Sequence, residues 1–272
     1  MSIKLIATDL DGTLMSPDHI TVTERTVTAL KMAHDRGIKI AIATGRPMSI
    51  IKNVTDQVDF VDYIIYSNGA CVYDRNEKCN LFERLIPNQT AIQAVEFMHK
   101  YPIFFEVYIN GRAHYQLGSE DYFVSDNLPQ AFLDSVMSEM VGHKDIIGAI
   151  GKSDVEKLTL YSIKSDFEMQ LEEKFRAYNL SVASSLKNNM EATAKNADKG
   201  EALKEICRII GISTDEAMCF GDSKNDCEMM RAAKFSFAMG NATEECKAAA
   251  NYLTASNGDD GLAKAVEKFV LC

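Results

Sequence analysis

Short apolar runs alternate with segments of helical periodicity in the first part of the chain. Residues 3–7 predict a strand. Thr21 and Glu24 have the spacing of a capping box, and apolar residues then recur at helical spacing as far as Gly37, so we predict a helix there. Residues 38–43 predict a second strand. A strand, a helix and a strand in this order predict two parallel strands joined by a right-handed crossover.

The C-terminal part of the chain repeats this alternation. Its apolar segments predict strands at 217–220, 235–238 and 252–253, and its periodic segments predict helices over 198–211, after Gly221 and up to Val270. In the first part of the chain, an apolar run before Asn68 predicts a further strand at 63–66. The strands are largely apolar, which is typical of a sheet that helices cover on both faces. Both ends of the chain are therefore expected to contribute to one α/β core.

The middle of the chain follows another order, in which strands succeed one another before the next helix begins. The expected elements are helices near 91–100, 130–140 and 167–178 and strands at 104–109, 114–117 and 158–163. This order is typical of an α+β domain with an antiparallel sheet. We therefore expect an α/β fold in which a doubly wound parallel-sheet core (1–84 and 188–272) is interrupted by an inserted α+β domain (85–187).

Aromatic residues are concentrated in this insertion. They alternate along the expected strands, which favours packing in the core of the insertion over the lining of a pocket. The residues are Phe104, Phe105, Tyr108, Tyr115, Tyr122 and Phe123.

Composition and charge narrow the classes of function. The 272 residues are 46% hydrophobic and 25% charged, as in ordinary globular proteins. The formal net charge of −10, without a basic stripe, argues against binding to nucleic acid or to an anionic membrane. We find no signal-peptide pattern and no apolar stretch of about 20 residues, the length that spans a bilayer, so we expect a cytoplasmic protein.

Cysteine and histidine residues show no ligand spacing. The seven cysteines are an odd number without a CxxC pair, which fits neither a disulfide framework nor a zinc site. The five histidines form no HExxH motif. We therefore expect mostly buried thiols and structural histidines.

The carboxyl ends of the predicted strands carry the unusual residues, namely Asp9 and Asp11, Thr44 and Gly45, Asn68 and Gly69, and Asp222, Asn225 and Asp226. Residues two apart on an extended chain face the same way, so the carboxylates of Asp9 and Asp11 are expected to converge. Two like charges about 4 Å apart near a protein surface repel by roughly 4 kcal/mol, so such a cluster needs protons, separation or a divalent cation. Carboxylate oxygens favour Mg²⁺.

Each of these signals has an ordinary structural explanation when it stands alone. DxDGT is also a strand end that turns through Asp and Gly, and TGRP is also a simple strand-to-helix turn. Lys199 is expected in the first turn of a helix, where a lysine side chain is normally solvated. Neither acidic segment fits an EF-hand loop, because Gly12 comes too early and Lys224 stands at a ligand position.

Four motifs in one order change this assessment. With DLDGTL, ATGR, ADKG and GDSKND in succession, the sequence resembles the haloacid dehalogenase superfamily of phosphohydrolases. The sequence also resembles the Cof-type (HAD-IIB) sugar-phosphatase branch of this superfamily. This resemblance rests on the long insertion and on three further motifs, SNGA, AMGNA and SNGDDGLA. The motifs cover about 1–86 and 187–272, and the middle matches only in position and length. The resemblance implies a Rossmann-like core with an inserted cap that selects the substrate.

The resemblance also implies a role for each motif residue. Asp9 is the expected nucleophile and Asp11 the expected general acid and base. Mg²⁺ is expected on Asp9, the backbone oxygen of Asp11 and Asp222, with Asp226 orienting them. Phosphate is expected to contact Thr44, Gly45, Lys199 and Asn225, and substrate to reach Arg46, Asn68 and Gly69.

The expected function is a Mg²⁺-dependent phosphatase of small phosphorylated metabolites, above all sugar phosphates, that acts through an aspartyl-phosphate. A phosphomutase of sugar phosphates is an alternative from the same chemistry. A signalling module that is phosphorylated on aspartate without hydrolysing esters is an alternative from another class, although such modules are short and lack DxDGT. The chain contains no P-loop and no GxGxxG motif. The sequence reveals neither the physiological substrate nor the oligomeric state.

Overall fold

An eight-stranded sheet organises the first of two units in the computed structural model, which describes residues 2–123, 136–184 and 188–272. The strand order is β14-β13-β12-β1-β2-β3-β4-β5. The strands are β1 (Leu5–Thr8), β2 (Lys39–Ala43), β3 (Tyr63–Tyr66), β4 (Cys71–Asp74), β5 (Cys79–Glu83), β12 (Ala217–Gly221), β13 (Phe235–Ala238) and β14 (Tyr252–Leu253).

The six strands from β14 to β3 are parallel, and β4 and β5 add an antiparallel edge. The order runs outward from β1 in both directions, as in a doubly wound sheet. Leu5 of β1 pairs with Ala217 on one side and with Lys39 on the other. The predicted α/β fold is confirmed, and β1 lies in the middle of the sheet.

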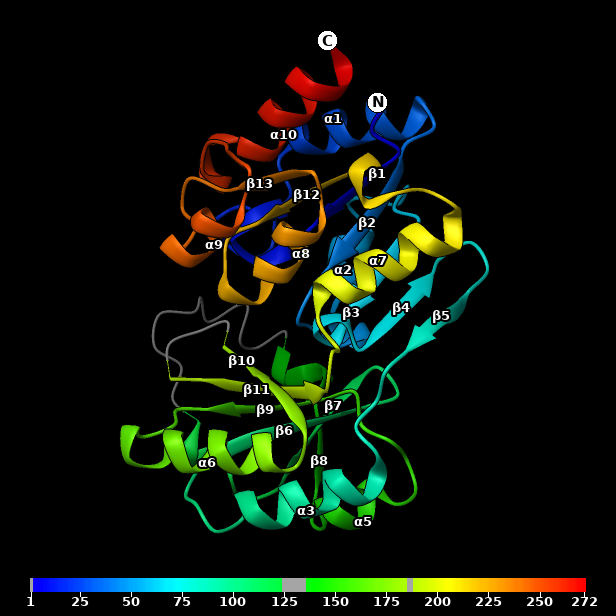
Figure 1. Ribbon diagram of the computed structural model, residues 1–272. Helices are drawn as coiled ribbons and strands as arrows, with labels where there is room; N and C mark the ends of the chain where they lie inside the picture. Colours follow the sequence, from blue (N-terminus) through cyan, green and yellow to red (C-terminus); the bar gives the residue numbers. More distant parts are fainter. Residues whose placement is uncertain (1, 124–135, 185–187) are drawn as a thin grey trace. The chain divides into compact units, whose positions relative to one another are not determined.

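Helices cover this sheet (Figure 1). They are α1 (Glu24–Asp35), α2 (Lys52–Thr55), α7 (Lys199–Ile210), α8 (Cys227–Ala232), α9 (Glu244–Ala249) and α10 (Gly261–Val266). Helices α7 and α8 pack against each other and against strands of the sheet, and α1 packs against α10. Among the described residues, no helix is both long enough and apolar enough to cross a membrane.

The start of α1 differs from the prediction. The N-cap is Thr23, whose side chain accepts a hydrogen bond from the Thr26 amide, and not Thr21. The Thr21 hydroxyl is engaged elsewhere, because it donates to Asp18 Oδ2 at 2.6 Å. Two threonines close to the same helix start look alike in the sequence, and the loop before the helix decides which one caps it.

The second unit comprises Arg46–Ile50 and Arg84–Ala197 and contains a six-stranded sheet of order β10-β11-β9-β6-β7-β8. Only the β7–β8 pair is parallel among these described strands. The elements are α3 (Asn88–Met98), β6 (Phe104–Ile109), β7 (Arg112–Gln116), β8 (Val141–His143), α5 (Ile146–Ile150), β9 (Lys157–Tyr161), α6 (Ser165–Ala177), β10 (Leu180–Ala183) and β11 (Met190–Ala194).

The extent of this unit differs from the expected insertion, 85–187. Strand β11 pairs with both β9 and β10, so the second unit continues to Ala197. The helix expected near 130–140 falls largely on residues outside the described ranges.

The two faces of the second sheet differ in chemistry. Phe105, Val107 and Leu158 belong to the apolar core that the sheet shares with α3, α5 and α6. Because side chains alternate along a strand, Phe104 and Tyr108 lie on the opposite face, where both are buried. The aromatic residues thus divide between the two faces.

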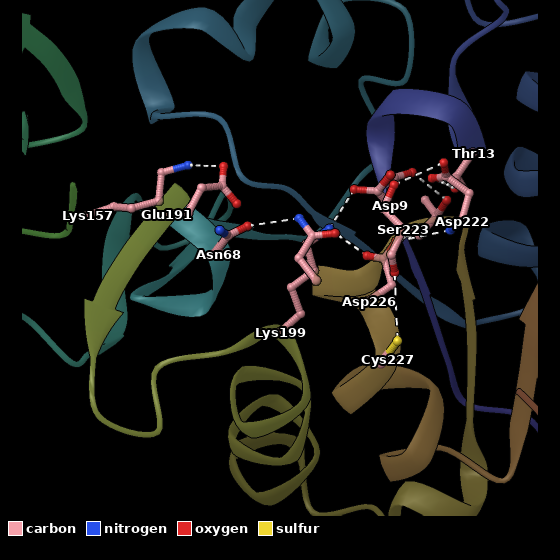
Figure 2. A network of polar contacts seen from close by, with 12 residues as sticks. Asp9, Thr13, Asn68, Lys157, Glu191, Lys199, Asp222, Ser223, Asp226 and Cys227 are labelled. Atoms are coloured by element: carbon pink, nitrogen blue, oxygen red, sulfur yellow. Dashed lines mark hydrogen bonds and ion pairs between the residues drawn. The ribbon is translucent and has the colours of Figure 1, made fainter. Parts of the chain in front are cut away.

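A buried ion pair lies in this second unit. Lys157 Nζ is 2.9 Å from Glu191 Oε1, and both side chains are at most 5% exposed (Figure 2). The Lys157 ammonium also lies 4.7 Å from the centre of the Tyr108 ring. Removal of one partner would leave the other charge buried and uncompensated.

We expect Lys157→Met to lower the free energy of unfolding by about 3–5 kcal/mol, because the Glu191 carboxylate then loses its counter-charge. The double replacement Lys157→Met with Glu191→Leu removes both charges and should cost less than the single one. Urea unfolding followed by circular dichroism measures both. Lys204→Met, which breaks an exposed pair with Glu201, is the control and should change the free energy by less than about 1 kcal/mol. A double variant that is at least as unstable as Lys157→Met alone would contradict this account.

Candidate active site

The end of β1 is fixed against the end of β12. The backbone amide of Asp9 donates a hydrogen bond to the Phe220 carbonyl at 3.0 Å, directly after the last residue of β1. The carboxyl ends of parallel strands meet at one edge of a sheet, where ligands of such folds bind. The segment after β12, which carries Asp222, Asn225 and Asp226, therefore begins at the same edge as Asp9.

A buried lysine joins these two strand ends (Figure 2). Lys199 Nζ lies 2.6 Å from Asp9 Oδ1 and 2.6 Å from Asp226 Oδ1. The Lys199 side chain is 0% exposed, although it belongs to the first turn of a helix, where lysine is normally solvated. Asp198 caps this helix by accepting a hydrogen bond from the Glu201 amide at 2.8 Å.

The close approach of another loop holds the start of α7. Gly69 ends the short turn η3 (Ser67–Gly69) with a φ of +92°. A Cβ atom at this position would overlap the Asp198 carbonyl, so only glycine fits there. Gly69, expected as a substrate contact, thus has a packing role beside α7.

Asp226 is the most constrained acid of the site. Its Oδ1 is bound to Lys199, and its Oδ2 accepts hydrogen bonds from the backbone amides of Asp222 and Ser223, both at 3.0 Å. Asp226 therefore fixes the backbone that carries Asp222. Asp222 in turn accepts hydrogen bonds from Thr13 Oγ1 at 3.0 Å and from Ser223 Oγ at 3.2 Å.

The three carboxylates carry more charge than the lysine neutralises. Oxygen atoms of Asp9, Asp222 and Asp226 lie within 4.8 Å of one another. Burial raises the pKa of Asp9 well above its usual value, Lys199 lowers this pKa, and the neighbouring Asp226 and Asp222 raise it further. Burial and Asp226 raise the pKa of Asp222 to about 6. Three carboxylates beside one ammonium fit a divalent cation, which would supply the missing positive charge.

Asn225 provides a second observation at this cluster. Its Nδ2 donates to Asn68 Oδ1 at 3.1 Å. Its Oδ1 is buried and, within the described part of the chain, accepts no hydrogen bond. A buried acceptor without a donor costs free energy unless a ligand or a water supplies one.

Thr44 and Asn68 connect the ends of β2 and β3. The Thr44 amide donates to the Ile65 carbonyl at 2.8 Å, and the Asn68 amide donates to the Thr44 carbonyl at 3.0 Å. Both side chains are buried. Gly45 ends this segment of the first unit, whereas Arg46 belongs to the second unit, so its expected contact with substrate stays a prediction.

Asp11 has a hydrogen-bond partner of its own, although its charge also raises the pKa of Asp9. Its Oδ1 lies 3.0 Å from His19 Nδ1, and its side chain is 36% exposed, against 8% for Asp9. The carboxylates that gather within 4.8 Å in the described structure do not include it. The turn η1 (Leu10–Leu14) begins directly after Asp9, and the backbone is extended at Asp9 and at Asp11 before Gly12, whose φ is +78°.

Comparison with known proteins decides the family. The family model of the haloacid dehalogenase-like hydrolases matches residues 6–266. The chain belongs to this family. Phosphatase YwpJ of Bacillus subtilis is 31% identical over 96% of this chain and 98% of its own length. The 5-amino-6-(5-phospho-D-ribitylamino)uracil phosphatase YcsE of the same organism is 26% identical over 100% of this chain and 97% of its own length.

A solved structure agrees with this assignment. The HAD subclass IIB sugar phosphatase BT4131 superposes with a TM-score of 0.85 and 28% identity, over 99% of this chain and 100% of its own. The predicted superfamily and its subclass IIB branch are confirmed, and the predicted class of enzyme, a phosphatase, is confirmed with them.

Two asparagines near the site are not among the residues predicted from the sequence, although they belong to the motifs AMGNA and SNGDDGLA. Asn241 Nδ2 donates to the Gly12 carbonyl at 2.8 Å, and Asn257 Nδ2 donates to the Met15 carbonyl at 2.9 Å. The Asn257 amide donates to Asn241 Oδ1 at 3.0 Å. The two loops therefore hold the turn that follows Asp9. His19 and Thr13 were missed because their roles depend on folded neighbours.

We expect Gly12→Ala to lower kcat/KM on p-nitrophenyl phosphate by about a hundredfold or more. A Cβ atom at Gly12 would lie 2.5 Å from Asp222 Oδ2, and a small displacement of a positioned group costs about this factor. Gly37→Ala is the matched control, because Gly37 also has a positive φ but nothing within 4 Å. It should keep activity within about twofold, although its positive φ costs some stability. Equal activities of the two variants would contradict a tight fit between Gly12 and Asp222.

Proposed function

We propose that this enzyme is a Mg²⁺-dependent phosphatase of small phosphorylated metabolites, in the first place sugar phosphates, that acts through a phosphoryl group on Asp9. The observation that carries the proposal is the buried arrangement of Asp9, Lys199, Asp222 and Asp226 at one edge of the sheet. It combines a nucleophile, a fixed positive charge and a candidate metal site.

Asp9 begins the reaction. One of its carboxylate oxygens attacks phosphorus, an oxygen–phosphorus bond forms, and the bond from phosphorus to the leaving oxygen breaks. Lys199 holds Asp9 Oδ1 at 2.6 Å, which restricts rotation of the carboxylate, and its charge offsets the charge of the phosphoryl group. In the second step water attacks phosphorus, and the bond to Asp9 breaks, which regenerates the carboxylate.

Asp11 moves the protons of both steps. It donates a proton to the departing alkoxide and later removes one from the attacking water. The Thr44 hydroxyl and the Gly45 amide would bind phosphate oxygens, and Asn225 Oδ1 would accept a hydrogen bond from a water or a ligand donor.

The carboxylates of Asp9 and Asp222 and the backbone oxygen of Asp11 would bind the cation. Asp226 would keep them in place, since it binds the amide of Asp222 and the ammonium of Lys199. A bound Mg²⁺ supplies positive charge that favours the ionised form of Asp9 and draws the phosphate to the site.

The substrate class rests on the relatives. A subclass IIB sugar phosphatase and a phosphatase of a phosphoribityl compound both match nearly the whole chain. Both names denote a phosphate ester on a carbon chain that carries hydroxyl groups. We infer that the second unit acts as a cap and selects the carbon chain of the substrate. The cytoplasmic location stays a prediction.

Asp9→Asn should reduce turnover of p-nitrophenyl phosphate to less than about a thousandth, because the amide is a poor nucleophile and forms no stable phosphoryl ester. The fold should persist, as checked by circular dichroism. Asp35→Asn, at an exposed position of α1, is the control and should retain full activity. A rate above about a tenth of wild type in Asp9→Asn would remove Asp9 from the role of nucleophile.

Removal of divalent ions with EDTA should abolish turnover, and Mg²⁺ should restore it. Asp222→Asn should raise the Mg²⁺ concentration that gives half-maximal rate by about tenfold or more, because it removes one negative ligand. Titration of Mg²⁺ against the initial rate measures both, again with Asp35→Asn as control. Full activity after exhaustive EDTA treatment would refute the metal dependence.

A further inference from the structure

His19 contacts the residue that the proposed function assigns to proton transfer. Its Nδ1 lies 3.0 Å from Asp11 Oδ1, and the imidazole is 27% exposed. No metal-ligand or nucleophile motif of the sequence includes His19. The contact joins a loop residue to an acid that follows the central strand, and both belong to the first unit.

The loop around His19 is closed by its own hydrogen bonds. Asp18 Oδ1 accepts from the amides of Ile20 and Thr21, both at 2.9 Å, and Asp18 Oδ2 accepts from Thr21 Oγ1 at 2.6 Å. The Ser16 amide donates to the Thr21 carbonyl at 2.8 Å, and the His19 amide donates to the Ser16 carbonyl at 3.0 Å. These hydrogen bonds within the loop fix the backbone that carries the His19 imidazole.

The backbone of His19 is itself unusual. Its φ of +59° lies in the left-handed region, which is uncommon for residues other than glycine. The closed loop keeps His19 in this conformation. The loop also joins the site directly, since Asn257 binds the Met15 carbonyl immediately before it.

The role that we infer requires one direction of this hydrogen bond. In the tautomer with the proton on Nδ1, His19 donates to Asp11 Oδ1, and the second oxygen of Asp11 carries the proton that is transferred. The carboxylate of Asp11 is held at Oδ1, outside the cluster that Asp9, Asp222 and Asp226 form in the described structure. A mobile carboxylate would spend most of its time in rotamers from which proton transfer fails, and a fixed one avoids this loss.

We propose that His19 is a positioning residue for Asp11: its Nδ1–H holds Oδ1 and thereby fixes the plane from which the second oxygen exchanges a proton with the leaving group and the attacking water. The inference rests on the proposed function. The role is geometric, because it requires a donor at this place and no change in the charge of the imidazole.

A comparison of substrates with different leaving groups distinguishes a positioning role of His19 from a merely structural one. An alkoxide leaves only with a proton, whereas p-nitrophenolate is weakly basic and leaves without one. A defect in the position of Asp11 therefore slows the hydrolysis of alkyl phosphates and spares that of p-nitrophenyl phosphate. A general loss of structure slows both.

The test compares His19→Gly with His19→Asn. Both residues accept a positive φ, but only asparagine keeps an N–H donor near the position of Nδ1. The alkyl substrate is the best of glucose 6-phosphate, ribose 5-phosphate and glycerol 2-phosphate for the wild type. We expect His19→Gly to lower its kcat about tenfold or more, with KM and the rate on p-nitrophenyl phosphate within about twofold. His19→Asn should restore most of the loss.

A double-mutant cycle completes the test. In an Asp11→Asn background, His19→Gly should have no further effect on the alkyl phosphate, because the group that it positions is already gone. Three results would overturn the inference: wild-type rates in His19→Gly, equal losses on both substrates, or a loss that persists beside Asp11→Asn. Failure of the proposed function has a different signature, namely turnover that survives Asp9→Asn or a wild type that hydrolyses none of the phosphates.

Discussion

The bridge from Lys199 to Asp9 and Asp226 is the interaction on which the rest of the site depends. It joins α7, the end of β1 and the segment after β12, three parts of the chain that are far apart in sequence. A fully buried ammonium is tolerated only when carboxylates compensate it, and each carboxylate is held by the same charge. The pair of contacts therefore fixes the positions of nucleophile and counter-charge before any substrate arrives.

The surrounding structure supports this bridge through the backbone. Oδ2 of Asp226 accepts hydrogen bonds from the backbone amides of Asp222 and Ser223. Gly69 allows its loop to approach the start of α7 closely. The turn after Asp9 is held by Asn241 and Asn257. Most of the polar groups that surround the candidate reaction centre are therefore bound before catalysis, as preorganisation requires.

Much of the first unit could be predicted because its pattern is local. Apolar runs located β1, β3 and β13, and the order of four motifs predicted which strand ends carry acids. The contact of Asp11 with His19 could not be predicted, since it depends on a loop with a left-handed residue. Strand β11 was missed because its buried face carries Glu191, which forms an ion pair with Lys157 of another strand.

The most direct test of the central claim is a crystal structure with Mg²⁺ and beryllium fluoride, a mimic of a phosphoryl group. The account predicts beryllium bonded to a carboxylate oxygen of Asp9, with the metal ion between Asp9 and Asp222 and Lys199 still in contact with the site. Beryllium fluoride on another residue, or a metal ion that does not touch Asp222, would contradict it.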